Sequence, residues 1–351
     1  MKDKYILGSE GDFHNFINLI SKRDKIGLVT HIDVDGIVSA VFLQKILESR
    51  DLKIEFIEFL NYQADILKNI LNKKFDILFF TDWSVDSYLE DLKQLRKKGK
   101  IFVVDHHPIN DKLKDKSNFI KTDSAYCSSH CLFDMAESGN YFNIKDLEWL
   151  VCASIIMDYT WDKLEGNFDF IKKVYPNVKK DATIWKSEPG KIGNLINGAL
   201  IYYQPDFRKV YDLVLKKDLE KLEKANEIIG MEVNNWIEKT KKEAEYFPEK
   251  KLLFNYANPK YNITSTIASI LSDRDFKGDT VIFASDFSDK KGFVKVSARN
   301  QMGNVDLGQL LKKCVEGFEN SSAGGHKKAA AGTFSKKYLN EFKERLLREL
   351  K

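Results

Sequence analysis

Four short apolar runs alternate with helical patterns over residues 25–104, and this rhythm constrains the fold more than any other feature of the chain. A strand, helix, strand, helix order predicts a parallel sheet covered by helices on both faces. We therefore expect an α/β fold. The predicted strands are Lys25–His31, Lys53–Leu60, Phe75–Phe80 and Ile101–Val104, and the predicted helices are Ile37–Leu47, Ala64–Leu71 and Val85–Lys98.

Polar side chains follow three of the four predicted strands. The groups are Thr30–Asp35, Thr81–Asp82 and Asp105–His107, whereas the second strand runs into Asn61 and offers no strong ligand. Parallel sheets bind ligands at the carboxyl ends of their strands. We therefore expect the three groups to meet at one edge of the sheet.

The convergent groups have the composition of a metal centre. Alternate residues of an extended segment share one face, which brings together the side chains of the first group. Single aspartates could be helix caps or solvated loop residues. That interpretation does not explain Asp105-His106-His107, because adjacent imidazoles beside a carboxylate have no packing role on an exposed loop. The candidate ligands are His31, Asp33, Asp35, Asp82, His106 and Asp158, the last at the end of a helix predicted over Lys145–Asp158.

These four carboxylates and two imidazoles fit Mn²⁺ better than zinc, which prefers thiolates. Six side chains are too many for one catalytic ion that keeps open coordination positions. Two ions that share a bridging carboxylate, about 3.5–4 Å apart, fit better. The sequence therefore predicts a two-metal centre.

The second half of the chain predicts a long helix and a smaller α+β unit. Residues 206–245 are charged and strongly helical, with apolar residues at spacings of three, four and seven. We interpret them as an amphipathic connector helix, with a self-associating coiled coil as the less favoured alternative. The pattern breaks near Pro248, and the expected segments are 1–205, 206–247 and 248–351.

Charge, cysteine content and hydropathy exclude several classes of protein. The 56 Lys and Arg residues nearly balance the 52 Asp and Glu residues, so the net charge indicates no particular partner. This balance is compatible with a locally basic cleft for an anionic substrate. Four cysteines are too few and too unevenly spaced for a disulfide scaffold. No apolar run reaches membrane-spanning length. We expect a cytoplasmic protein with no membrane partner.

Five blocks of sequence resemble the DHH phosphoesterase superfamily and its DHHA1 partner domain. The fifth block, GGHKKAAAG (Gly324–Gly332), is the DHHA1 signature. The match covers about residues 25–335, and HIDVDG is more similar to the RecJ and archaeal RecJ-like nuclease branch than to the small-oligonucleotide branch. The first four blocks are THIDVDGIVSA (Thr30–Ala40), FFTDWS (Phe79–Ser84), VVDHHP (Val103–Pro108) and IIMDYTWD (Ile155–Asp162).

The resemblance implies a DHH domain with a role for each candidate residue. Asp82 bridges the two ions. Asp105 orients and polarises a neighbouring imidazole, and His107 faces the scissile phosphate. The implied ligand sets are His31, Asp33 and Asp82 for one ion, and Asp35, Asp82, His106 and Asp158 for the other.

The resemblance also implies that the DHHA1 domain binds the substrate. Gly324 and Gly325 let backbone N–H groups approach a phosphate, and we expect an Ala-rich helix to begin directly after the histidine that follows them. That residue, His326, adds a hydrogen-bond donor. Arg299, at the end of a strand predicted over Gly292–Arg299, adds others.

The implied activity is Mn²⁺-dependent hydrolysis of single-stranded DNA or short RNA from an end, with Mg²⁺ as a possible substitute. One alternative is a phosphodiesterase or phosphatase of small nucleotides, such as cyclic dinucleotides, nanoRNA or 3′-phosphoadenosine phosphate. Another is a non-catalytic replication scaffold, which the complete ligand set disfavours. The expected partners are a single strand and replication or repair proteins. Bases could stack on Trp83 or Tyr159, but we expect both rings to pack in the core.

Overall fold

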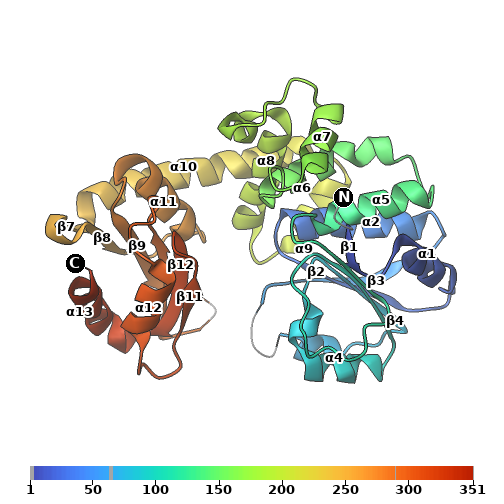
Figure 1. The fold of residues 1–351 in the computed structure, drawn as a ribbon, viewed down its shortest axis with the longest axis horizontal. Helices are drawn as coiled ribbons and strands as arrows, with labels where there is room; N and C mark the ends of the chain where they lie inside the picture. The colour runs from blue at the N-terminus through green and yellow to red at the C-terminus, as the bar shows by residue number, and fades with distance from the viewer. Residues whose placement is uncertain (1–3, 63–65, 289, 351) are drawn as a thin grey trace. The chain divides into compact units, whose positions relative to one another are not determined.

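The computed structural model describes residues 4–62, 66–288 and 290–350 (Figure 1). The contacts within the chain divide it into two units, Met1–Asn226 and Glu227–Lys351. The division falls inside helix α10 (Leu219–Glu243). Each unit has its own sheet and its own hydrophobic core.

The first unit is built around a six-stranded sheet. In spatial order its strands are β1 (Tyr5–Leu7), β6 (Phe119–Thr122), β5 (Lys100–Asp105), β4 (Ile77–Thr81), β2 (Ile26–His31) and β3 (Ile54–Leu60). The strands β2 to β6 run parallel, and β1 runs antiparallel to β6 at one edge. The predicted α/β class with a parallel sheet is therefore confirmed.

Helices cover both faces of this sheet (Figure 1). Leu28 and Phe79 belong to the larger core, whereas the next residues along the same strands, Val29 and Phe80, belong to the smaller core on the opposite face. The smaller core includes residues of α3 (Lys68–Leu71) and α4 (Leu89–Arg96). The larger core includes residues of α1 (Glu10–Asn18), α2 (Val34–Glu48), α5 (Ser128–Ser138), α6 (Glu148–Met157), α7 (Glu165–Val174), α8 (Glu188–Tyr203) and α9 (Phe207–Leu215).

The start of α2 explains how the first polar group is held at the sheet edge. The side chain of Asp33 caps α2 by accepting a hydrogen bond from the N–H of Gly36 at 2.9 Å. A Cβ atom at Gly36 would lie 2.3 Å from the carbonyl oxygen of His31, so this close approach requires glycine. The helix is buried on nearly all sides, which fixes its first turn and Asp35 against the core.

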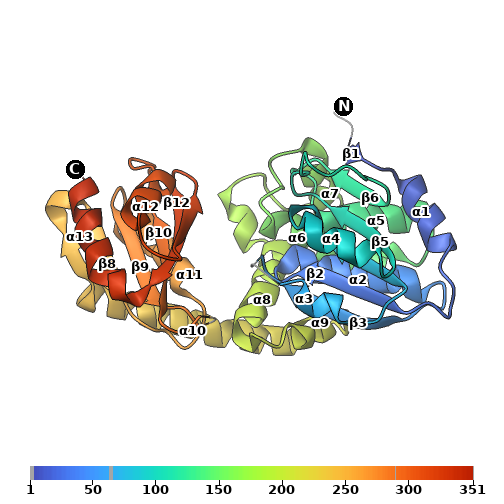
Figure 2. The same ribbon diagram turned by 90° about the horizontal axis from the view of Figure 1, so that it is seen from below.

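The second unit contains another six-stranded sheet (Figure 2). In spatial order its strands are β11 (Ser322–Gly325), β12 (Ala329–Ser335), β10 (Phe293–Arg299), β9 (Thr280–Asp286), β8 (Leu252–Tyr256) and β7 (Glu245–Phe247). Neighbours are antiparallel apart from the parallel pair β8 and β9. The core includes α12 (Leu307–Val315) and α13 (Leu339–Glu349), while α11 (Thr264–Ile270) packs against β9 and β10. This is the predicted α+β unit.

Short helical turns complete the described structure. Part of the helix predicted over Ala64–Leu71 falls at residues 64–65, outside the described residues, and α3 forms its end. The helix predicted over Val85–Lys98 is a 3-10 turn followed by the shorter α4. The turns are 3-10 helices at Val85–Ser87, Ile144–Leu147, Ala182–Lys186, Pro248–Lys250 and Lys336–Tyr338, and a π-helix at Leu271–Asp275.

The expected long connector helix is present as α10, but its predicted start at residue 206 is wrong, because the separate helix α9 occupies the first part of this stretch. After α9 the backbone turns left-handed at Lys217 (φ 54°). The side chain of Asp218 then accepts a hydrogen bond from the N–H of Lys221 at 3.3 Å in the first turn of α10. The helix α9 packs on α2 and α8 of the first unit. The segment limits at residues 205 and 247 stay a prediction.

The Ala-rich segment after His326 is a strand and not the start of a helix. Residues Ala329–Ser335 form β12, which pairs with β10 on one side and with β11 on the other. Pairing on both sides overrides the helix preference of three consecutive alanines. The glycine pair therefore ends a strand of a β-hairpin. The helix start expected after His326 is wrong, whereas phosphate binding by the two glycines stays a prediction.

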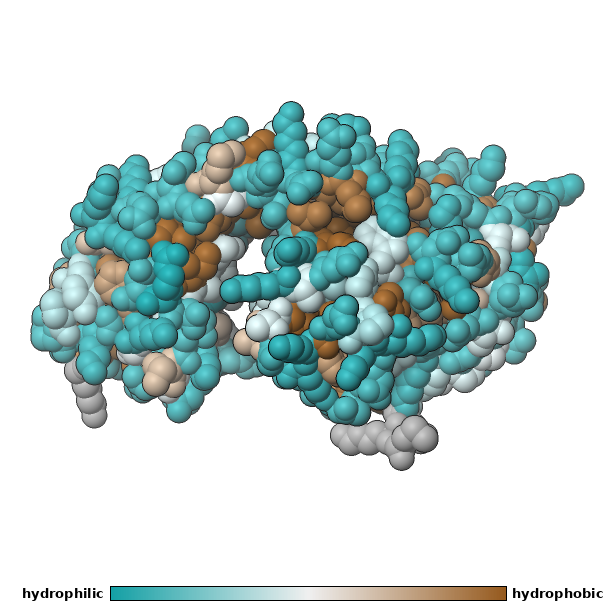
Figure 3. All heavy atoms as spheres, turned by 90° about the horizontal axis from the view of Figure 1, so that it is seen from above, coloured by the Kyte–Doolittle hydropathy of each residue, from teal (hydrophilic) through white to brown (hydrophobic). Residues whose placement is uncertain are grey.

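The face in Figure 3 is mainly hydrophilic, with hydrophobic residues in smaller groups between polar ones. Within the described ranges, no helix combines the length and the apolar character that crossing a lipid bilayer requires.

Candidate metal centre

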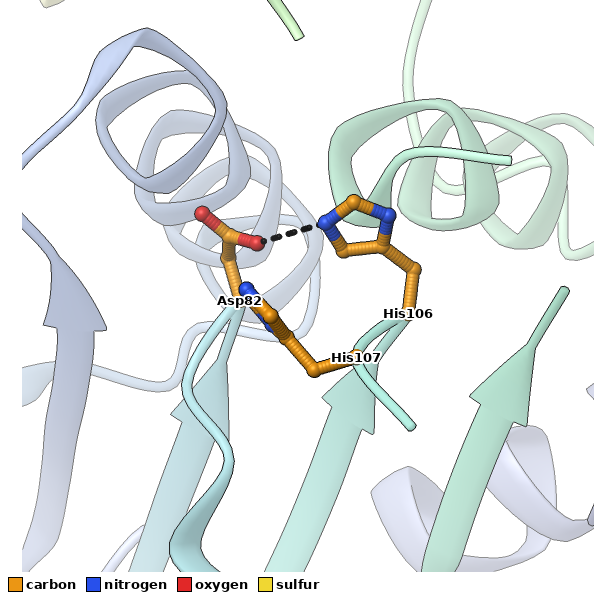
Figure 4. A group of neighbouring side chains, drawn as sticks. All are labelled: Asp82, His106 and His107. Carbon is orange, nitrogen blue, oxygen red and sulfur yellow. Dashed lines mark ion pairs between the residues drawn. The ribbon is translucent and has the colours of Figure 1, made fainter. Parts of the chain in front are cut away.

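Three neighbouring strands of the first sheet bring the predicted polar groups to one edge. The strand β2 ends at His31, β4 is followed by Asp82, and β5 ends at Asp105. These strands are adjacent and parallel, so their carboxyl ends lie together. Figure 4 shows the side chains of Asp82, His106 and His107 gathered at this edge.

Asp82 lies at the centre of the group. Its Oδ2 is 3.9 Å from Nδ1 of His31, and its Oδ1 is 3.4 Å from Nε2 of His106. The residue is 1% exposed and has a left-handed backbone (φ 53°), which is uncommon outside glycine. Its N–H donates to the carbonyl of Val104 at 2.9 Å. This turn holds one carboxylate between two imidazoles.

Two carboxylate oxygens at this edge are buried without a hydrogen-bond donor. Among the described residues, Oδ2 of Asp82 and Oδ2 of Asp158 have no such partner. Asp158 caps the end of α6, and its Oδ2 is 3.6 Å from Nδ1 of His106. Buried polar atoms are nearly always paired, so anionic oxygens left unpaired beside imidazoles mark a place for a cation. The donor set fits a divalent metal.

The first polar group contributes to the site in two ways. His31 and Asp33 join Asp82, because Nδ1 of His31 is 2.7 Å from Oδ2 of Asp33 and the three residues offer ligand atoms within 4.8 Å of one another. Asp35 is held instead by α5, whose first two N–H groups donate to its carboxylate at 2.8 and 3.1 Å. A helix N-terminus stabilises a carboxylate in this way.

The carboxylates at this edge repel one another, and their pKa values reflect this. Burial raises the pKa of Asp82 well above its usual value, and the charges of four neighbouring aspartates raise it further. Burial also raises the pKa of Asp158 to about 7, against the opposing charge of His106. Burial disfavours the charged form of His106, but nearby carboxylates outweigh it and raise its pKa. A bound divalent cation relieves this repulsion.

His107 forms a second group with Asp82 and His106. The three residues offer ligand atoms within 4.8 Å of one another, so His107 is placed to contact either an ion or its substrate. Its Nδ1 lies 2.7 Å from Oδ1 of Asp105, the contact expected for an orienting carboxylate. Despite burial, the hydrogen bond from His107 and the charge of Lys121 hold the pKa of Asp105 below its usual range.

Sequence patterns missed two residues that complete this edge. Lys121 of β6 is buried, and its Nζ lies 2.5 Å from Oδ2 of Asp105. The ring centroid of Tyr62, after β3, is 5.3 Å from that of His31 and 5.8 Å from that of His107. A lone lysine or tyrosine carries no motif. The position after a predicted strand was an available signal for Tyr62, whereas Lys121 lies inside a strand that the sequence did not reveal.

Two aromatic residues that follow candidate ligands have different surroundings. Trp83 is fully buried and stacks between Tyr62 and Tyr88, so its predicted core packing is confirmed. Core packing is wrong for Tyr159, which is 65% exposed. Its left-handed backbone (φ 55°) turns the chain after Asp158, and its ring lies 4.9 Å from that of Trp185. The exposed ring is thus held on a second aromatic side chain.

The predicted substrate-binding residues lie close together in the second unit. Arg299 of β10 pairs with Ala329 of β12, next to the turn that carries His326. Its guanidinium donates to the hydroxyl groups of Ser265 and Ser269. His326 is exposed, and its N–H donates to the carbonyl of Ala329 at 2.8 Å.

The two predicted glycines end β11, but they differ in what their backbone requires. Gly325 has a φ of 139°, and a Cβ atom there would lie 2.5 Å from the carbonyl oxygen of Ala329. The turn therefore needs glycine at this position. Gly324 faces open space where a Cβ atom would stand among the described residues.

The sequence matches two known domain families in chain order. The DHH family, N-terminal domain, matches residues 25–157, and the DHHA1 domain matches residues 249–351. With the parallel sheet and its Asp and His edge, these matches define a two-domain protein of the DHH phosphoesterase class. The chain belongs to the DHH/DHHA1 superfamily, as its motifs predict. No curated protein sequence matches it.

Solved structures share this fold at low sequence identity. The exonuclease RecJ bound to manganese has a TM-score of 0.73 at 15% identity, over 97% of this chain and 94% of that one. RecJ in complex with Mn²⁺ from Thermus thermophilus has a TM-score of 0.72 at 15% identity, over 97% of this chain and 54% of that one. CDC45 from Entamoeba histolytica has a TM-score of 0.61 at 13% identity, over 97% and 98%. The fold is RecJ-like, and the chain spans about half the length of the Thermus protein.

Proposed function

We propose that this protein is a Mn²⁺-dependent phosphodiesterase that hydrolyses single-stranded DNA or short RNA from an end. The observation that carries the proposal is the buried carboxylate of Asp82, which lies between His31 and His106 with one oxygen unpaired among the described residues. A fold shared with an exonuclease bound to manganese supports the reaction class.

We assign the metal ions to two overlapping sets of ligands that share Asp82. Mixed imidazole and carboxylate donors suit Mn²⁺, whereas Mg²⁺ prefers oxygen and is the weaker substitute. When bound, the two ions supply a hydroxide near neutral pH and offset charge on the phosphoryl oxygens. One set is His31, Asp33 and Asp82. The other is Asp82, His106 and Asp158, with Asp35 added from the family resemblance.

The chain's own side chains orient the phosphate. Asp105 accepts the hydrogen bond from Nδ1 of His107, which leaves Nε2 of that ring to contact the phosphate. In the second unit, Arg299 and His326 bind substrate phosphates, with Gly324 and Gly325 allowing the backbone to approach.

Two features favour a strand over a small nucleotide. Tyr159 follows Asp158 directly and is 65% exposed, so a base can stack on its ring near the metal ligands. In the second unit, His326, Lys327 and Lys328 are consecutive and exposed, which suits contacts to backbone phosphates. A strand offers bases and several phosphates to these side chains, whereas a mononucleotide does not.

Strands of graded length separate the proposal from its alternatives. With Mn²⁺, the purified protein should shorten end-labelled strands of about 4–16 nucleotides, the usual range of single-strand sites, faster than dinucleotides. Hydrolysis confined to dinucleotides, cyclic dinucleotides or 3′-phosphoadenosine phosphate would contradict it and establish the small-nucleotide alternative. Failure to cut any of these with Mn²⁺ bound would favour the replication scaffold.

We also propose a cytoplasmic location. The four cysteines are free and buried in the structure, which suits a reducing compartment. The proposed replication or repair partners rest on the family resemblance.

A further inference from the structure

Lys121 is the one lysine or arginine that is buried among the described residues, at 1% exposure. It lies in β6, directly opposite Asp105 in the parallel pair β5 and β6. Lysine is almost never fully buried unless it is paired, because its ammonium group is strongly hydrated. Its place beside the metal edge therefore needs an explanation.

The ammonium group of Lys121 has four oxygen neighbours. Oδ2 of Asp105 lies at 2.5 Å, Oδ1 of Asp86 at 2.9 Å, and Oγ of Ser84 and the carbonyl oxygen of His107 both at 3.3 Å. An ammonium group has three N–H donors, so these neighbours saturate it. The contacts tie strand β6 to Asp105 and His107 of the DHH motif.

Asp86 anchors Lys121 from the other side. It is fully buried, and its Oδ1 also accepts a hydrogen bond from Oγ of Ser84 at 3.0 Å. Its Oδ2 accepts from the N–H of Asn110 at 2.7 Å. With both oxygens engaged, the Asp86 carboxylate is rigid, and the ammonium group is held between it and Asp105.

The backbone and ring of His107 are both held by this network. Oδ1 of Asp105 accepts from Nδ1 of His107 at 2.7 Å and from its N–H at 3.3 Å, while Lys121 donates to its carbonyl. The ring is thereby presented to Asp82 (Figure 4). We propose that Lys121, anchored by Asp86, is a positioning residue that clamps Asp105 and thereby holds the His107 imidazole in its productive orientation. The activity test of this clamp rests on the proposed function.

Kinetics and metal binding test the clamp together. Lys121→Met keeps the length of the side chain and removes the ammonium group. In the wild-type protein the ammonium group of Lys121 contacts none of the six candidate ligands in the described chain. Calorimetry of Lys121→Met should therefore show unchanged Mn²⁺ equivalents. We expect kcat to fall about 10- to 100-fold, as when groups that support metal-site residues are lost, with KM within about twofold. Asp86→Asn should lower kcat about tenfold by the same route.

A matched control separates the clamp from general destabilisation. Lys4 of the same unit also pairs with two carboxylates, those of Glu10 and Asp134, and lies outside the network around Asp105. Lys4→Met should leave kcat unchanged. An equal loss of kcat in Lys4→Met, or a loss of Mn²⁺ equivalents in Lys121→Met, would overturn the proposal.

Proton NMR makes the clamp testable without a substrate. In the Mg²⁺ form, the Nδ1–H proton of His107 should give a downfield resonance that disappears in His107→Gln. It should shift or broaden in Lys121→Met and Asp86→Asn but not in Lys4→Met. If Lys121→Met folds and both its His107 resonance and its kcat are unchanged, the clamp is overturned. If Lys121→Met fails to fold, the same two measurements on Asp86→Asn decide whether the clamp exists. A responsive resonance in a protein that hydrolyses nothing would refute the proposed function and support the clamp.

Discussion

Oδ1 of Asp82 lies 3.4 Å from Nε2 of His106, while its Oδ2 lies 3.9 Å from Nδ1 of His31 and accepts no hydrogen bond within the described chain. Burial and four neighbouring aspartates raise the pKa of this carboxyl group, because its charged form is poorly stabilised without a cation. The metal-free protein is therefore expected to be less stable than the metal-bound protein, and the difference should depend on this residue.

Asp82→Asn should have opposite effects on the two forms. Asparagine tolerates the left-handed backbone, so the turn is kept. Removing an uncompensated buried charge should stabilise the metal-free protein by about 1–2 kcal/mol. In a unit of this size, each kcal/mol raises the melting temperature by roughly 2–4 °C. Calorimetry should show loss of tight Mn²⁺ binding. Asp51→Asn, at an exposed left-handed position, is the control, and unchanged Mn²⁺ equivalents in Asp82→Asn would refute the bridging assignment.

The stability of the metal-free protein should fall as pH rises from about 4 to above 7. The pKa of Asp82 is raised well above 3.8 in the folded state and that of Asp158 to about 7, so the folded chain binds more protons than the unfolded chain over this range. The raised pKa values of His31 and His106 act in the same direction at higher pH. The aspartates with lowered pKa values act with the opposite sign below about pH 4, and His130, whose pKa burial lowers to about 4, acts with the opposite sign between about pH 4 and 6.5. The combined shifts of Asp82, Asp158, His31 and His106 are expected to exceed it.

Urea unfolding in EDTA at about pH 5 and about pH 8 measures this dependence, and the same titration with Mn²⁺ should show greater metal stabilisation at the higher pH. A metal-free stability that stays level or rises between these values would contradict the predicted repulsion at the site.

Tyr159→Ala should raise KM for an oligonucleotide about 5- to 150-fold, because stacking contributes roughly 1–3 kcal/mol per base. Its effect on kcat should be small, since the ring contacts no candidate ligand side chain in the described structure. Tyr159→Phe keeps the ring and should behave as wild type. Hydrolysis of bis(p-nitrophenyl) phosphate, which has no base, should be unchanged, and a parallel loss there would show that Tyr159 supports the metal centre instead.

His326→Ala should weaken substrate binding without disturbing the metal centre. A hydrogen bond to a charged phosphate contributes about 1.5–3 kcal/mol, so kcat/KM should fall at least about tenfold. Mn²⁺ equivalents should stay the same, because His326 belongs to the second unit and the candidate ligands to the first. Lys312→Ala, at an exposed position on α12, is a control for lost positive charge. Loss of a Mn²⁺ equivalent in His326→Ala would show that its role is misplaced.

Sequence reasoning succeeded where signals are local and repeated. The strands β2 to β5 are five to seven residues long and rich in apolar residues, and their ends were predicted to within a few positions. The strands β1 and β6, of three and four residues, are too short to show a period. The sequence therefore hid β6, and with it the buried cation Lys121.

Other features depend on tertiary contacts that a local pattern cannot express. Three alanines favour a helix, yet β12 is a strand because β10 and β11 flank it. Large aromatic residues usually pack inside, yet Tyr159 is exposed because the chain turns left-handed after Asp158. The DHH motif predicted which residues meet at the edge, but Tyr62 reached the same place without any motif.

Hydrolysis of one end-labelled single strand, compared with its blunt duplex and a closed circle of the same sequence, tests the central claim most directly. With Mn²⁺ and the same salt in each reaction, the proposal predicts that the linear strand is degraded from an end while the duplex and the circle resist. Cutting of the circle as fast as the linear strand, or hydrolysis of neither by the Mn²⁺-loaded protein, would contradict it.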